Sequence, residues 1–149
     1  MYIESSNIGS DYVGTEFIDY LGFIYMEGGG EFEVDQIIGV NNNFTTGLNM
    51  DYLGGVSPHY SVDRMSSFGG TLFTCEGGFG RMILKHTENN TVVSSSIVMG
   101  ALANGDSLNL KPFFITEMLY KFLEYDPAVS IDEYLYRNSE VSLFTNHEN

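Results

Sequence analysis

TVVSSSIVMGALANGDSLNLKPFFITEMLYKFLEY, residues 91–125, is the stretch that decides the fold class. It begins with a β-branched run over 91–98, which gives way to a polar loop over 104–107. An amphipathic helix over 110–125 follows, with Pro112 in its first turn, where the N–H that proline lacks is not needed. A strand that leads through a short polar loop into a helix is the unit from which layered α/β domains are built.

The helix over 110–125 carries apolar side chains at helical spacing. Its predicted buried stripe consists of Ile115, Met118, Leu119, Phe122 and Leu123. Its candidate N-cap residues are Asp106, Ser107 and Asn109, because their side-chain oxygens can accept the first N–H groups of the helix. Asp126-Pro127 ends the helix, since proline cannot continue it.

The rest of the chain is rich in strand patterns. Two runs, 81–86 and 91–98, flank the polar residues 88–90, which is typical of a β-hairpin. Further strands are predicted over 1–5, 33–40, 50–53, 62–65 and 71–75. A short helix is predicted over 11–21, with Gly22 at its C-terminal stop.

We therefore predict an α/β domain over 1–125. It is a layered sandwich, in which a mixed sheet contains a β-hairpin over about 81–98 and has flanking helices. Residues 126–149 are predicted to be a C-terminal extension, helical over 131–136 and frayed at its end.

The chain has 149 residues and a formal net charge of -14, which argues against nucleic acid or an anionic membrane as a partner. The acidic residues are spread along the chain, which is typical of a solvated acidic surface; a diffuse surface that attracts Ca²⁺ is the alternative. No stretch reaches the roughly 18 apolar residues that a membrane-spanning helix needs. We therefore predict no membrane insertion.

Cys75 is the one residue whose type and position suggest catalysis. It directly follows a predicted strand in Thr74-Cys75-Glu76-Gly77-Gly78, and His86 could serve as the base for its thiolate. A nucleophile elbow, however, needs small residues two positions before and after the nucleophile, and Phe73 occupies the first of these. A buried structural cysteine is the other interpretation, and we favour it.

No metal or cofactor site is predicted. His59, His86 and His147 lie far apart in the chain and share no ligand spacing with the acidic residues. The glycines of 77–80 lack the lysine and the helix start that a phosphate-binding loop requires. Tyr12, Tyr52 and Tyr60 lie in or near predicted loops and suggest a carbohydrate- or peptide-binding module as one alternative function.

Several segments together resemble a known family. They are MYIE at 1–4, VGTEFIDYLG at 13–22, DY at 51–52, VD at 62–63, GGTLF at 69–73 and SSSIVMGAL at 94–102. Their hydrophobic framework and glycine placement resemble the class I glutamine amidotransferase-like, flavodoxin-like modules of large secreted bacterial proteins. The resemblance implies a three-layer α/β domain that is incomplete here, with its first strands upstream of Met1. It carries no catalytic role to any residue, since no cysteine elbow is present.

The sequence therefore favours a non-catalytic structural or interaction module of a larger exported protein, secreted or on the cell surface. Its expected partners are the rest of the parent chain or a second copy bound through an exposed sheet edge. The alternatives are a cysteine-dependent hydrolase or amidotransferase-like enzyme that uses Cys75 and His86, and the carbohydrate- or peptide-binding module.

Overall fold

The computed structural model describes residues 1–28, 34–53, 62–67, 70–75, 77–105 and 110–124. Its strands are β1 (Tyr2–Glu4), β2 (Ile24–Glu27), β3 (Gln36–Gly39), β4 (Asn49–Asp51), β5 (Arg64–Ser66), β6 (Thr71–Cys75), β7 (Gly80–Thr87) and β8 (Asn90–Ser95). Its helices are α1 (Ile8–Tyr12), α2 (Glu16–Leu21), the short 3₁₀ helix η2 (Met99–Ala101) and α3 (Leu110–Glu124). The extension predicted over 126–149, with its helix over 131–136, lies outside the described residues.

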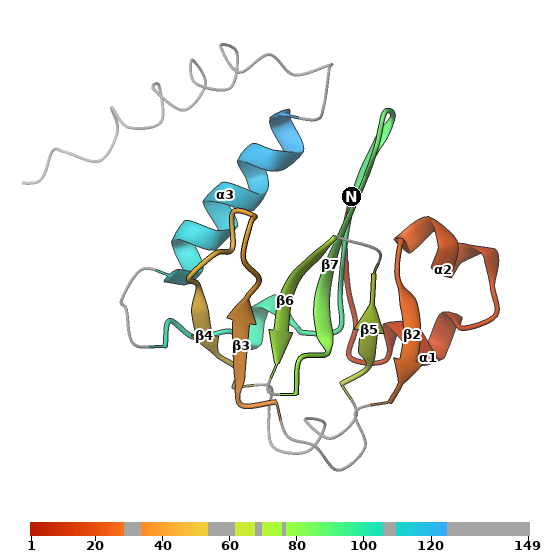
Figure 1. Cartoon of the computed structure of the whole chain (residues 1–149), viewed down its shortest axis with the longest axis horizontal. Helices are drawn as coiled ribbons and strands as arrows, with labels where there is room; N and C mark the ends of the chain where they lie inside the picture. Colours follow the sequence, from red (N-terminus) through yellow and green to blue (C-terminus); the bar gives the residue numbers. More distant parts are fainter. Residues whose placement is uncertain (29–33, 54–61, 68–69, 76, 106–109, 125–149) are drawn as a thin grey trace, which may run out of the picture.

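The eight strands form one mixed sheet, which confirms the predicted α/β class. Its main path runs β1-β8-β7-β6-β3-β4, while β5 pairs with β7 and β2 pairs with β5 (Figure 1). Only the β1–β8 pairing is parallel; the other pairings among the described strands are antiparallel. A flavodoxin-like sheet is parallel and carries its helices in the crossovers between strands. The flavodoxin-like assignment is therefore not confirmed.

The predicted hairpin is confirmed as β7 and β8. Thr87 pairs with Asn90, so that the turn consists of Glu88 and Asn89. The second arm ends at Ser95 rather than at residue 98. The Oγ atom of Ser95 accepts the N–H of Ile97 at 3.1 Å and donates to the Ile97 carbonyl at 2.6 Å. Such local side-chain bonds compete with the ladder of a sheet and end the strand here.

Neighbouring residues of β7 and β8 belong to two different hydrophobic clusters. Met82 and Val93 pack in a large cluster with residues of α3, whereas Ile83 and Val92 pack in a second cluster with residues of α1 and α2. Successive side chains of a strand point to opposite faces of the sheet. The two clusters therefore lie on opposite faces, with helices on both, as Figure 1 shows for α3 beside β4 and for α1 and α2 beside β2.

The N-terminal helix differs from the prediction. A single helix is expected over 11–21, but the chain forms α1 and α2, separated at Val13 and Gly14. Gly14 has a φ of 79°, a left-handed conformation that interrupts an α-helix. Gly22 has a φ of 84° and caps α2, as predicted. The strand β2, which follows after Phe23, is not predicted, because the whole segment between the helix cap Gly22 and the glycines 28–30 is only residues 23–27.

The helix α3 is confirmed, but it is rotated relative to the predicted stripe. Phe114 and Met118 are buried, whereas Leu119 is exposed. The side chain of Phe114 decides this rotation, because its ring packs edge-on against Phe73 with the ring centres 4.9 Å apart. The side-chain oxygen of Asn104 accepts the N–H of Lys111 at 3.0 Å near the start of the helix. The predicted caps Asp106, Ser107 and Asn109 lie outside the described residues.

Candidate functional site

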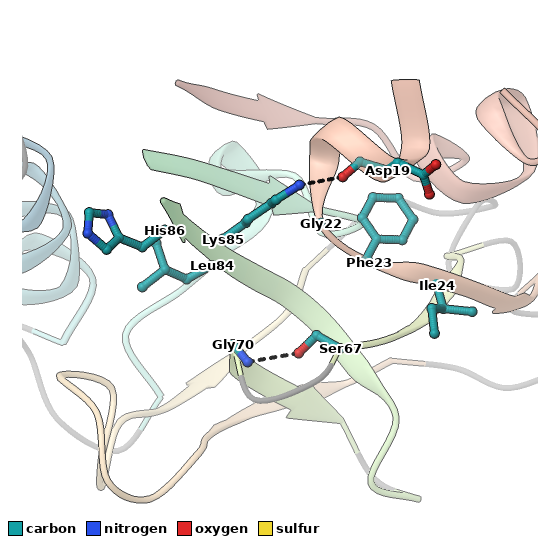
Figure 2. A pocket seen from close by; sticks show the side chains of 9 residues that line it. All are labelled: Asp19, Gly22, Phe23, Ile24, Ser67, Gly70, Leu84, Lys85 and His86. Atoms are coloured by element: carbon teal, nitrogen blue, oxygen red, sulfur yellow. Dashed lines mark hydrogen bonds between the residues drawn. The ribbon is translucent and has the colours of Figure 1, made fainter. Parts of the chain in front are cut away.

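An open cavity of about 560 Å³ lies where the end of α2 and the start of β2 face β7 (Figure 2). We call it the groove. The residues that line it are Asp19, Gly22, Phe23, Ile24, Ser67, Gly70, Leu84, Lys85 and His86. Phe23, Ile24 and Leu84 give it an apolar interior, and the polar side chains stand around them. This composition is typical of a binding site.

Lys85 closes one side of the groove. Its ammonium donates a hydrogen bond to the carbonyl oxygen of Asp19 at 2.6 Å, drawn as a dashed line in Figure 2. That carbonyl belongs to the last turn of α2, which contains no basic residue of its own. A cation near the carbonyl end of a helix is stabilising, and the bond satisfies an acceptor that the helix leaves open. Lys85 therefore has a structural use within the chain.

Two further polar side chains of the groove, those of Ser67 and His86, are also engaged. The Oγ atom of Ser67 accepts the N–H of Gly70 at 3.0 Å and lies 3.1 Å from the hydroxyl of Thr71. The Nδ1 atom of His86 lies 3.1 Å from the hydroxyl of Thr91 on the neighbouring strand. In Figure 2 the imidazole of His86 points away from Ser67, so the two side chains do not form a nucleophile–base pair. The geometry suits binding better than catalysis.

Cys75 lies in the core, outside the groove. It is 5 % exposed, and its sulfur accepts a hydrogen bond from the Nε atom of Arg81 at 3.0 Å. Arg81 is itself 1 % exposed, and its Nη1 atom donates to the backbone carbonyls of Val62 and Asp63. The thiol thus helps to satisfy a buried guanidinium, which is a structural role.

The two candidate catalytic residues do not meet. Cys75 follows Thr74, which pairs with Gly80 at the beginning of β7, whereas His86 lies near the other end of that strand. Six residues separate Gly80 from His86, which corresponds to about 20 Å along a strand. The arrangement therefore gives no support to a thiol–imidazole pair within one chain.

The remaining sequence candidates are not brought together either. Among the described residues, no group of three or more His, Cys, Asp or Glu side chains could hold a metal ion. Tyr12 packs edge-on against Phe17 in the helical layer, and Tyr52 is buried in the large cluster, so these tyrosines do not share a surface. Tyr60, His59 and His147 lie outside the described residues. Among the residues that the structure does describe, no helix is long and apolar enough to cross a membrane.

A second polar cluster lies at the end of β1. One carboxylate oxygen of Glu4 accepts the hydroxyl of Tyr2 at 2.7 Å and the N–H of Met99 at 2.6 Å. Burial raises the pKa of Tyr2 well above its ordinary value, and the bond to Glu4 raises it further. Burial also raises the pKa of Tyr52, whose hydroxyl lies near Val98. Because the carboxylate holds η2 against β1, we interpret this cluster as structural.

No protein-family model, no curated protein and no solved structure matches this chain. The family resemblance therefore stays a prediction that rests on the residues alone.

Sequence reasoning singles out His86 but misses the groove in which it lies. The sequence pattern predicts a helix around Asp19 and a strand around Arg81 and Lys85. These charged residues do not form a recognisable motif. A charge at Arg81, directly before the apolar run 82–84, is the one signal that could have pointed to a buried polar group.

Proposed function

We propose that this protein is a non-catalytic interaction module, which binds a partner protein at the groove between α2, β2 and β7. The observation that carries the proposal is an apolar cavity in which the side chains of Ser67, Lys85 and His86 already bond within the chain. Lys85 is held by Asp19, and Ser67 is held by Gly70. A ligand would gain mainly from covering apolar surface, which is the usual basis of protein–protein binding.

The apolar surface extends beyond the groove. Ile24, which lines it, is 45 % exposed, and Met26 on the same strand is 52 % exposed. Tyr25 between them packs closely on α1, because a Cβ atom at Gly9 would lie only 2.4 Å from the Tyr25 ring. Ile24 therefore points away from α1. A small molecule would need only the cavity and would leave the neighbouring apolar side chains exposed. A protein partner would cover them as well, and we therefore favour a protein.

The alternatives have less support. The hydrolase or amidotransferase-like function requires Cys75 and His86 to meet, and about 20 Å of strand separates them. A binding module that uses Tyr12 and Tyr52 requires an accessible Tyr52, which is buried. The proposal does not depend on the flavodoxin-like resemblance. That the module belongs to a larger exported protein stays a prediction.

Selection of peptides from a random displayed library tests the proposal. For peptides that bind the wild-type chain, the affinity for the Ile24→Asp variant and for the Leu53→Asp variant is then measured. Both variants place an acid at an exposed apolar residue, but Leu53 follows β4 at the opposite edge of the sheet. We expect Ile24→Asp to weaken binding by about tenfold or more and Leu53→Asp by less than about twofold. A library that yields no peptide with this discrimination would overturn the groove as a binding site.

A further inference from the structure

One wall of the groove comes from a part of the chain that contains no Lys or Arg. The first Lys or Arg of the sequence is Arg64. The preceding residues include ten acids, namely Glu4, Asp11, Glu16, Asp19, Glu27, Glu31, Glu33, Asp35, Asp51 and Asp63. The segment that forms α1, α2 and β2 is therefore purely anionic, and it supplies one wall of the groove.

The cations that other elements bring near this segment are held within the chain. Arg64 is buried and forms an ion pair with Glu27 of β2. Lys85 donates its bond to the carbonyl of Asp19, and Arg81 is enclosed in the core. The Asp19 carboxylate, in contrast, lines the groove and points away from the Lys85 ammonium (Figure 2). The wall of the groove formed by α2 and β2 therefore carries acidic side chains and no Lys or Arg, while the Lys85 ammonium on the facing strand keeps its positive charge.

Apolar side chains are interleaved with this charge. Tyr12, Val13 and Tyr20 are exposed on α1 and α2, as Ile24 and Met26 are on β2. Tyr20 lines a small depression together with Lys85, which also lines the groove, so the two depressions adjoin at this lysine. An apolar cavity beside an acidic wall is an arrangement that selects a partner by its charge.

We infer that the partner is a cationic protein, which places an apolar side chain in the groove and Lys or Arg side chains against the acids around it. The inference rests on the proposed function and adds the chemistry of the partner. A second copy of this chain is a poor occupant, because each copy carries a formal charge of -14. Like charges brought together across an interface are strongly unfavourable.

Three synthetic peptides of equal length and equal isoleucine content test the inference. Their remaining residues are all lysine, all glutamine or all glutamate. At low ionic strength we expect the lysine peptide to bind about tenfold more tightly than the glutamine peptide. The difference should fall below about threefold at roughly 0.5 M salt, because screening shortens the range of surface charges. Fluorescence anisotropy of labelled peptides gives both affinities.

Two isosteric variants locate the charge effect. Asp19→Asn removes a carboxylate from the groove and keeps the backbone carbonyl that Lys85 binds. Glu117→Gln removes the same charge from α3, which packs on the other face of the sheet. We expect Asp19→Asn to weaken binding of the lysine peptide by about threefold, and Glu117→Gln to leave it nearly unchanged.

The outcomes separate this inference from the proposed function. Equal binding of the lysine and glutamine peptides, with both still weakened by Ile24→Asp, would overturn the cationic partner but keep the groove. Preferential binding of the glutamate peptide, or a dimer of the chain that Ile24→Asp dissociates, would overturn it as well. If no peptide binds in a way that depends on Ile24, the proposed function fails together with the inference.

Discussion

The ammonium of Lys85 lies 2.6 Å from the carbonyl oxygen of Asp19, although 66 residues separate the two in the chain. This bond attaches the end of α2 to the middle of the β7–β8 hairpin. Beneath it, Gly22 lies against the aliphatic stem of Lys85, where a Cβ atom would be only 2.5 Å from the Cβ of Lys85. The groove thus depends on a glycine that lets the lysine lie flat across the end of the helix.

We predict that Gly22→Ala destabilises the protein by about 2–4 kcal/mol. Its φ of 84° is left-handed, which costs an alanine about 1 kcal/mol, and the added methyl group must also displace Lys85. Urea unfolding, followed by circular dichroism, measures the loss.

Gly14→Ala is the matched control for this substitution. Gly14 has a similar φ of 79°, but nothing lies within 4 Å of the position that a Cβ atom would take. Gly14→Ala should therefore lower the free energy of unfolding by only about 1 kcal/mol, the cost of placing an alanine in a left-handed conformation. Equal losses in the two variants would contradict the close contact between Gly22 and Lys85.

The elements with strong local signals were predictable from the sequence. The strand 71–75, the hairpin and the helix α3 each have a long or sharply bounded pattern, and the structure contains all three. The break between α1 and α2 was not predicted, because the apolar spacing of 11–21 continues through Gly14 as though the helix did. A single glycine conformation outweighs that spacing.

The groove could not be predicted in the same way. It exists because residues around Asp19 and Lys85 are brought together by the pairing of distant strands, and no local pattern encodes such a meeting. The contact between Cys75 and Arg81 spans only six residues, yet it depends on the register shifts between β6 and β7. Sequence spacing alone places such side chains on faces of the sheet, but it does not say which of them touch.

Labelling of Cys75 in the native protein should be slow. Its side chain is 5 % exposed, so a thiol reagent reaches it only when the structure opens. We expect the rate near neutral pH to be at least about 100-fold below the rate in concentrated urea. Labelling with a chromogenic disulfide in both solvents gives the ratio. Rapid modification of the folded chain would instead favour the enzyme alternative.

The hydrogen bond between Arg81 and Cys75 predicts different costs for two substitutions at residue 75. Cys75→Ala removes the acceptor of a buried N–H group, and we expect a loss of about 1–3 kcal/mol. Cys75→Ser keeps an acceptor at nearly the same place and should lose less. Urea unfolding of both variants measures the difference. If serine costs as much as alanine, the sulfur contributes by packing and not by accepting the bond.

Stability should fall with rising pH above about 10, the ordinary pKa of tyrosine. Burial, followed by the bond to Glu4, raises the pKa of Tyr2 in the folded state. The folded chain therefore keeps a proton that the unfolded chain loses, and the free energy of unfolding decreases by up to about 1.4 kcal/mol per pH unit. Below about pH 9 this group has no effect on the pH dependence, because Tyr2 is then protonated in both states.

Urea unfolding at a series of pH values between about 8 and 11 tests this in the wild type, in Tyr2→Phe and in Glu4→Gln. Tyr2→Phe should flatten the decline, because the titrating hydroxyl is gone. Glu4→Gln should flatten it less, since burial is the larger cause of the raised pKa and remains in place. Tyr52, whose pKa burial also raises, keeps part of the decline in both variants. If the decline in Tyr2→Phe is as steep as in the wild type, the raised pKa of the Tyr2 hydroxyl is not its cause.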